Sequence, residues 1–311
     1  MSEIEHFLKA LRKSGEDRTV FGNERVAHLV ADGNKILSAR TVEGLVVRTE
    51  TLADGISADV TVRENVRIEN PVHLCFGVLH KEGMQRIIPT IRLEPGSSAH
   101  FVAHCFFPTA KSVTHMMDGD VDVGEGAEMR YTEAHFHGPY GGVRVIPKAR
   151  VRVRSRARYT SDFSLITGRV GHLDIDYRVE LDDESIVEMT ARVFGHADDR
   201  IIIREEVILS GVNARSLIKT RVALENDAVA EITGITEGRA AGSRGHVDCM
   251  EIVRDRAVAK AIPIVTVTNP LAKVTHEAAI GSVDKRQMET LMAHGLTPEE
   301  AVDVIVRGIL K

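Results

Sequence analysis

The sequence predicts a mainly β protein, built as a parallel β-helix with a short helix at its start and a helical hairpin at its end. Three observations support this fold class: a short apolar unit recurs at a fixed interval, the apolar residues are mostly aliphatic, and the last residues change to helical periodicity. We expect residues 1–60 to form a helical and mixed segment, residues 61–283 the β-helix, and residues 284–311 the hairpin.

Composition favours strands and excludes several functions. The 311 residues are 43% hydrophobic but only 4% aromatic, without Trp, so Val, Ile, Leu and Ala must build the core. A net charge of −5 argues against nucleic-acid binding. No signal peptide or transmembrane run is visible. The chain has three cysteines, Cys75, Cys105 and Cys249, which are too few for a disulfide framework. Together these observations predict a cytoplasmic protein without membrane contact.

The first residues have the pattern of an amphipathic helix. Ser2 and Glu5 fit a capping box, and Gly15 fits a helix end. Four apolar residues share one face at helical spacing: Ile4, Phe7, Leu8 and Leu11.

The middle of the chain repeats a unit of an apolar pair, a turn, a small residue and a second apolar pair. The unit starts at Ile91, Val121, Val151, Val179, Val207, Val222 and Ile252. The intervals are about 30 residues, with one of about 15, which suggests one or two turns of a coil with roughly 15 residues per turn. Such coils bury their apolar faces by stacking on one another. Because spacing does not fix strand direction, an antiparallel sandwich or jelly roll stays open as an alternative.

The last residues predict two helices joined by a tight turn. Met288, Leu291 and Met292 share one helical face before Gly295, a natural C-terminal cap residue. Thr297 then caps a second helix with Pro298 in its first position. This hairpin either covers an open end of the β-helix or docks a partner.

Motifs for self-contained catalysis are missing from the sequence. It contains no GK[ST] phosphate loop, no GxSxG elbow and no HExxH. His135 and His137 lie on one side of a strand, and with His104 they suggest a cupin-like mononuclear metal enzyme. The Glu that cupins place shortly after this pair is absent, and imidazoles on a solvated sheet face are the alternative.

A second group of potential ligands lies near the end of the repeats. Cys249 is followed, 27 residues later, by His276 and then Glu277. Thiolate and imidazole are ligands of iron–sulfur sites, and carboxylate is a harder substitute. The alternative is a buried structural Cys beside an unrelated His.

Residues 245–311 resemble the C-terminal core of the SufB/SufD family of iron–sulfur cluster assembly proteins. The resemblance rests on Pro263, on the HEA run that starts at His276, on Asp284, and on the closing hairpin with Glu299, Glu300 and Ala301. The length is similar to that of a compact archaeal-type member, and the first ~90 residues carry no clear match.

The resemblance implies a right-handed β-helix and a scaffold rather than an enzyme. A transient iron–sulfur cluster, such as a 4Fe–4S cluster, would be built on it and passed to apo-proteins, with sulfur from a separate donor. ATP would act only through a SufC-type ABC ATPase, docked on the C-terminal hairpin. Two chains would pair as a homodimer or as a SufB/SufD-type heterodimer. A docking subunit without any metal is a third hypothesis.

The resemblance also implies site residues. The cluster-associated Glu of the family falls on Glu277, beside His276. Without gaps the cluster-associated Cys falls on Asp248, one residue before Cys249, and a one-residue bulge would restore the face. We therefore predict Cys249, Glu277 and His276 as cluster ligands, with Asp248 as an alternative oxygen ligand. The sulfur-accepting cysteine of the family matches neither Cys75 nor Cys105 clearly.

Overall fold

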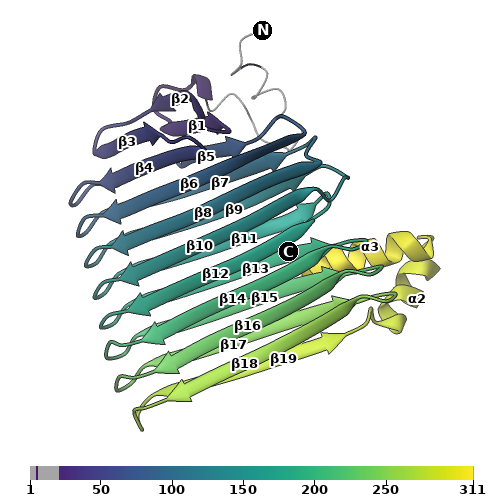
Figure 1. Ribbon diagram of the computed structural model, residues 1–311. Helices are drawn as coiled ribbons and strands as arrows, with labels where there is room; N and C mark the ends of the chain where they lie inside the picture. Colours follow the sequence, from purple (N-terminus) through teal and green to yellow (C-terminus); the bar gives the residue numbers. More distant parts are fainter. Residues whose placement is uncertain (1–4, 6–20, 311) are drawn as a thin grey trace.

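The computed structural model describes residue 5 and residues 21–310, which form a solenoid of two stacked β-sheets followed by two helices (Figure 1). The N-terminal helix predicted from Ser2 to Gly15 falls, apart from Glu5, outside the described residues. No helix in the described part of the chain is long and apolar enough to cross a membrane.

Strands alternate between the two sheets as the chain advances. Sheet A contains, in spatial order, β19 (Lys273–Gly281), β17 (Arg244–Val253), β15 (Arg215–Leu224), β13 (Ile186–Gly195), β11 (Arg158–Thr167), β9 (Glu128–His137), β7 (Ser98–Phe107), β5 (Val72–Gly77), β1 (His28–Asp32) and β2 (Lys35–Arg40). Sheet B contains β18 (Val258–Val267), β16 (Val229–Gly238), β14 (Arg200–Leu209), β12 (His172–Leu181), β10 (Val143–Val153), β8 (Ser112–Val123), β6 (Glu82–Leu93), β4 (Gly55–Val62) and β3 (Leu45–Thr51).

The strand pairing is parallel along the solenoid, which confirms a parallel β-solenoid over the antiparallel alternatives. Among the described strands, antiparallel pairing occurs only where β1 meets β2 and β3 meets β4. Both pairings lie at the N-terminal end of the stack (Figure 1).

Each turn contains two strands, so the prediction of roughly 15 residues per turn was wrong. Val121 pairs with Val151 on the same sheet, and Val222 pairs with Glu251, which puts about 29 residues in a turn. The shorter interval, from Val207 to Val222, is half a turn, because Val207 lies in sheet B and Val222 in sheet A.

Small residues occupy tight corners, as the repeat predicted. The Ala127 amide donates to the Gly124 carbonyl at 2.9 Å, and the Ala157 amide donates to the Arg154 carbonyl at 3.0 Å. Gly126 and Arg156, just before these alanines, have φ near +60°. Both alanines are buried, so a larger side chain would not fit where the chain turns into the next strand.

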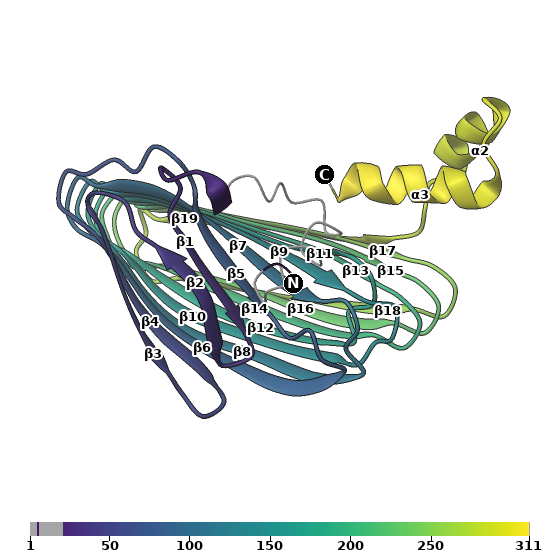
Figure 2. The same cartoon turned by 90° about the horizontal axis from the view of Figure 1, so that it is seen from above.

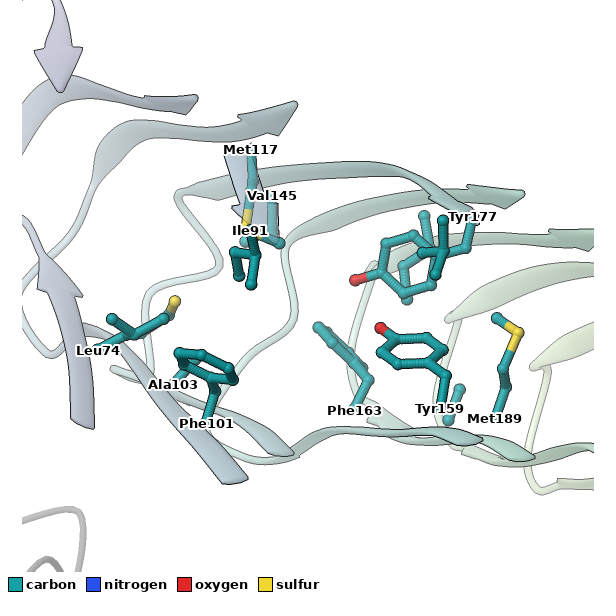
Figure 3. Packing of buried hydrophobic residues seen from close by; sticks show 14 of the residues in the cluster. Leu74, Ile91, Phe101, Ala103, Met117, Val145, Tyr159, Phe163, Tyr177 and Met189 are labelled. Atoms are coloured by element: carbon teal, nitrogen blue, oxygen red, sulfur yellow. The ribbon is translucent and has the colours of Figure 1, made fainter. Parts of the chain in front are cut away.

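Inward-facing side chains from both sheets form one continuous core. It runs from Ala27 to Cys249 and includes aliphatic residues from nearly every turn. Phe101, Phe163, Tyr159 and Tyr177 are among the larger side chains of this core (Figure 3). The alternation of buried and half-exposed residues along each strand therefore determines which side chains can meet inside the solenoid.

The C-terminal hairpin forms as predicted. Helix α2 spans Lys285–Ala293, and α3 spans Pro298–Ile309 with a complete capping box between Thr297 and Glu300. In Figure 2 the two helices stand beside the solenoid rather than over its last strands. Helix α3 packs Val302 and Val306 on a patch of the outer face of sheet A that includes Ala223. The hairpin therefore does not cover the open end.

Candidate functional site

Cys249 and His276 meet on the inner face of sheet A, at its C-terminal end. Cys249 lies on β17 and His276 on β19, the last strand of the sheet. The register pairs Val247 with His276 and Cys249 with Ala278. Because Val247 and Cys249 both belong to the core, His276 faces the same interior, diagonally across from Cys249.

Gly234, on β16 of the opposite sheet, leaves room beside these two side chains. A Cβ atom placed on Gly234 would lie 2.9 Å from Cγ1 of Val247, 3.4 Å from Cε1 of His276 and 4.0 Å from Sγ of Cys249. The thiol and the imidazole therefore border one space, which any side chain at position 234 would enter.

Both groups are neutral in this environment. Burial, with smaller contributions from the carboxylates of Glu251 and Glu205, raises the pKa of the Cys249 thiol to about 12. Burial lowers the pKa of His276, with a smaller contribution from His246. Both ring nitrogens of His276 are buried without a hydrogen-bond partner. A metal ion here would be bound by a free imidazole lone pair and would displace the thiol proton.

Two buried glutamates at this site were not identified from the sequence as ligands. Glu251 faces the interior two residues after Cys249, and neither carboxylate oxygen has a hydrogen-bond partner. Glu205 pairs in register with Gly234 and accepts a hydrogen bond of 3.0 Å from Thr220 Oγ1. Burial raises the pKa of each glutamate to about 7. The sequence feature that could have identified them is an acidic residue at an inward-facing position of an otherwise apolar strand.

Glu277 and Asp248 lie on the other face of the sheet. They pair with each other in register, and that register is continuous from Arg244 to Ile252. The bulge expected to turn Cys249 toward the face of Glu277 is therefore absent, and that expectation was wrong. Glu277 is exposed, whereas Asp248 accepts a hydrogen bond from Arg221, which lowers its pKa. The structure brings His276 to Cys249 but separates both from Glu277.

The three histidines of the cupin-like hypothesis do not converge. His135 and His137 face the buried interior rather than solvent. His104 precedes the inward-facing Cys105, so it lies on the outer face of β7, where its ring stacks 6.2 Å from that of His73. A jelly roll is antiparallel, whereas these strands pair in parallel. The cupin-like alternative has no support.

The last turn of the solenoid is an open end. In the described part of the chain, β18 pairs only with β16, and β19 only with β17. Side chains that would be core residues in an inner turn remain exposed there: Val265 at 42%, Val267 at 46% and Ile280 at 48%. Unpaired edges and exposed apolar side chains form a surface suited to another sheet end.

Removing the charge of Glu205 should change how stability depends on pH. The folded pKa is about 7, above the ordinary value of 4.5. Between these values the unfolded chain is ionised and the folded chain is protonated, so unfolding releases a proton and stability falls as pH rises. The stability that depends on a protonated Glu205 is complete below pH 4.5 and is lost above about pH 7. We expect Glu205→Gln to be more stable than wild type by up to about 3 kcal/mol at pH 8.

Urea unfolding at pH 5 and pH 8 checks this expectation. The wild-type protein should lose stability between the two pH values, and the variant should lose less. Glu82→Gln, at an exposed position on β6 of the same sheet, is the matched control and should behave as wild type. An equal pH dependence in wild type and Glu205→Gln would contradict the assignment.

The fold is therefore a parallel β-solenoid in which a thiol and an imidazole border one space at the open end. Residues 81–309 match the SufBD core domain of SUF-system FeS cluster assembly. The chain belongs to the SufBD family of iron–sulfur cluster assembly proteins.

Relatives from archaea match over the whole chain. An iron–sulfur cluster assembly SufBD family protein of Pyrococcus horikoshii is 36% identical over 310 residues, which cover 100% of this chain and 94% of the relative. One of Methanocaldococcus jannaschii is 34% identical and covers 99% of this chain and 98% of the relative. A Staphylococcus aureus SufBD protein is 24% identical, and its match covers only 54% of its own length. The family assignment from the sequence is confirmed.

Proposed function

We propose that this chain is the scaffold subunit of a SUF-type assembly complex, on which a nascent iron–sulfur cluster is held before transfer to apo-proteins. The observation that carries the proposal is the shared space between Cys249 and His276 at the open end of the solenoid. Iron and sulfide are the cargo of this site. Catalytic ATP chemistry belongs to a separate ABC-type ATPase.

One chain offers too few soft ligands for a stable cluster. Cys249 and His276 are one thiolate and one imidazole, whereas stable clusters usually have four protein ligands. Glu251 is the nearest additional carboxylate in sequence on the same face. A weak ligand set suits a protein that must release its cluster.

Pairing of two open ends would supply the missing ligands. Val265, Val267 and Ile280 are core-side residues that a second solenoid end could bury. A twofold pairing repeats every ligand across the interface, so two chains present two thiols and two imidazoles. In such a dimer the outer-face carboxylates Glu277 and Asp248 belong to the rim, where Glu277 remains a candidate ligand from the partner side.

The direct test is anaerobic co-purification of the chain with its ABC-type ATPase and with iron and sulfide measured on the complex. The proposal expects both iron and acid-labile sulfide on the wild-type complex. A complex that forms but never contains sulfide, even after reconstitution with iron and sulfide, would contradict the proposal and indicate a docking subunit that holds no cluster.

The C-terminal hairpin is the proposed docking surface for the ATPase. Met292 on α2 is 38% exposed and Val304 on α3 is 47% exposed, although both are apolar. Met288 of α2 packs against the cluster between α3 and sheet A, but no residue of α2 is fully buried, and Met292 remains accessible to a partner. We expect the double variant Met292→Asp and Val304→Asp to lose ATPase binding by at least about tenfold.

Pull-down with the purified ATPase measures this binding. Ile202→Asp is the matched control, because Ile202 is an apolar residue of similar exposure, 40%, on the outer face of sheet B. Circular dichroism should show the same strand signal in all three proteins. Unchanged binding by the double variant would place the docking surface elsewhere.

A further inference from the structure

The middle of the solenoid contains a second group of metal-ligand side chains, far along the stack from Cys249. Cys105 on β7 and Glu133 and His135 on β9 all face the interior. One donor atom from each lies within 4.8 Å of the other two, and all three side chains are buried. We propose that Cys105, Glu133 and His135 bind one divalent transition-metal ion, Zn²⁺ or Fe²⁺, inside the solenoid.

Distances within the group fit this proposal. Sγ of Cys105 lies 3.9 Å from Oε1 of Glu133, close to the ~3.6 Å separation of sulfur and oxygen ligands on one tetrahedral ion. Nε2 of His135 lies 2.7 Å from the same oxygen, which is the length of a hydrogen bond. Two ligands of one tetrahedral ion would be ~3.3 Å apart. The ion would therefore replace the shared proton, with a side-chain shift of about half an ångström.

Several polar atoms around the group are buried in the core without a hydrogen-bond partner. Oε2 of Glu133, Nδ1 of His135, Nε2 of His137 and both ring nitrogens of His115 are buried without a hydrogen bond. Leaving such atoms without a partner destabilises a fold, and native proteins contain few of them. A cation bound by the group would give a partner to Nε2 of His137 and bring Oε2 of Glu133 next to a positive charge.

His137 is positioned to be the fourth ligand of the ion. Its Nδ1 donates to the Arg169 carbonyl at 2.9 Å, which leaves an unprotonated Nε2. This is the arrangement in which imidazoles bind metals, with the second nitrogen held by a backbone carbonyl. The ring centroid of His137 lies 5.7 Å from that of His135, on the same face of β9.

Charge balance also favours a divalent ion. A thiolate from Cys105 and a carboxylate from Glu133 together cancel two positive charges, so the occupied site is neutral. A neutral centre can be buried where isolated charges cannot. Ligand types of this mixture, sulfur, nitrogen and oxygen, suit Zn²⁺ and Fe²⁺ rather than Mg²⁺ or Ca²⁺. The site is independent of the proposed cluster, because it shares no residue with Cys249 and His276.

Metal analysis of the anaerobically purified protein tests the proposal. Beyond any iron that is bound together with acid-labile sulfide, we expect about one Zn or Fe per chain, retained in Cys249→Ala, where no sulfide is bound, and lost in Cys105→Ser. Glu133→Gln keeps the side-chain volume and removes one charge, so it should lower metal content at least about tenfold under competition with a chelator. Cys75→Ser is the control, a substitution of another buried cysteine outside the group.

Refolding with Co²⁺ gives a second readout, since a cobalt–thiolate bond produces a charge-transfer absorption band. The band should appear in wild type and in Cys75→Ser and be absent from Cys105→Ser. If Cys105→Ser fails to fold, the metal content of Glu133→Gln is compared with that of wild type, and a lower content in the variant supports the site. Wild-type protein that takes up no metal on refolding with Zn²⁺, Fe²⁺ or Co²⁺, or metal content unchanged in the folded variants, would overturn the proposal. The metal recovered from cells distinguishes Zn²⁺ from Fe²⁺.

Discussion

Replacing Cys249 with alanine is expected to remove the iron–sulfur absorption that appears on anaerobic reconstitution. The thiol is the only sulfur ligand that the structure places beside His276 among the described residues. Its loss leaves imidazole and carboxylate donors, which hold iron but bind an iron–sulfur cluster poorly. We expect acid-labile sulfide, and the iron bound with it, to fall at least about tenfold, since removing even an outer partner of a metal ligand costs 10–100-fold.

Two further variants separate ligand loss from a change in the fold. Cys75→Ala removes a buried cysteine from β5 and should leave reconstitution unchanged. Gly234→Ala keeps every ligand but puts a methyl group 3.4 Å from Cε1 of His276 and 2.9 Å from Cγ1 of Val247, so it should weaken cluster binding by filling the shared space. Circular dichroism checks that the contact with Val247 leaves the fold unchanged. Full iron and sulfide content in Cys249→Ala would remove this thiol from the site.

Charged residues at the open end are expected to separate the paired chains. Val265 and Ile280 face the core side of the last turn, but both are more than two-fifths exposed. The double variant Val265→Asp and Ile280→Asp puts two carboxylates of each chain into an apolar interface, where burying an unpaired charge costs several kcal/mol. We expect the dimer to dissociate at concentrations where the wild type remains paired.

Analytical ultracentrifugation of both proteins measures the effect. Ile202→Asp again serves as the control, because it adds one exposed charge away from the open end. The dissociated variant should also reconstitute less cluster, since each chain then offers only its own Cys249 and His276. A wild-type protein that is monomeric at all concentrations, or a variant that stays paired, would contradict pairing through this end.

The architecture could be predicted because apolar and polar residues alternate along each strand and the apolar pattern recurs at a fixed interval. Apolar starts such as Val121 and Val151 lie directly above each other on neighbouring strands. The size of a turn could not be predicted, because the start of a strand in sheet A looks the same as one in sheet B. The C-terminal hairpin was predictable in detail, since Thr297, Pro298 and Gly295 determine local backbone geometry.

The site was only partly predictable. Cys249 and His276 are 27 residues apart, two fewer than the register spacing of one turn, so they lie diagonally on neighbouring strands. The inner position of His276 and the outer position of Glu277 depend on strand register, which a one-residue change reverses. Glu205 reaches the site from the opposite sheet, and no local pattern links it to Cys249. Glu133 was missed for the same reason, because its partner Cys105 lies on another strand.

Pulsed electron paramagnetic resonance of the reduced, reconstituted protein with ¹⁵N-labelled histidine shows whether His276 and Cys249 bind the cluster. We expect a ¹⁵N coupling to the cluster that disappears in His276→Gln, and no cluster signal in Cys249→Ala. A cluster without histidine coupling in the wild type, or one that forms normally without the Cys249 thiol, would contradict this expectation.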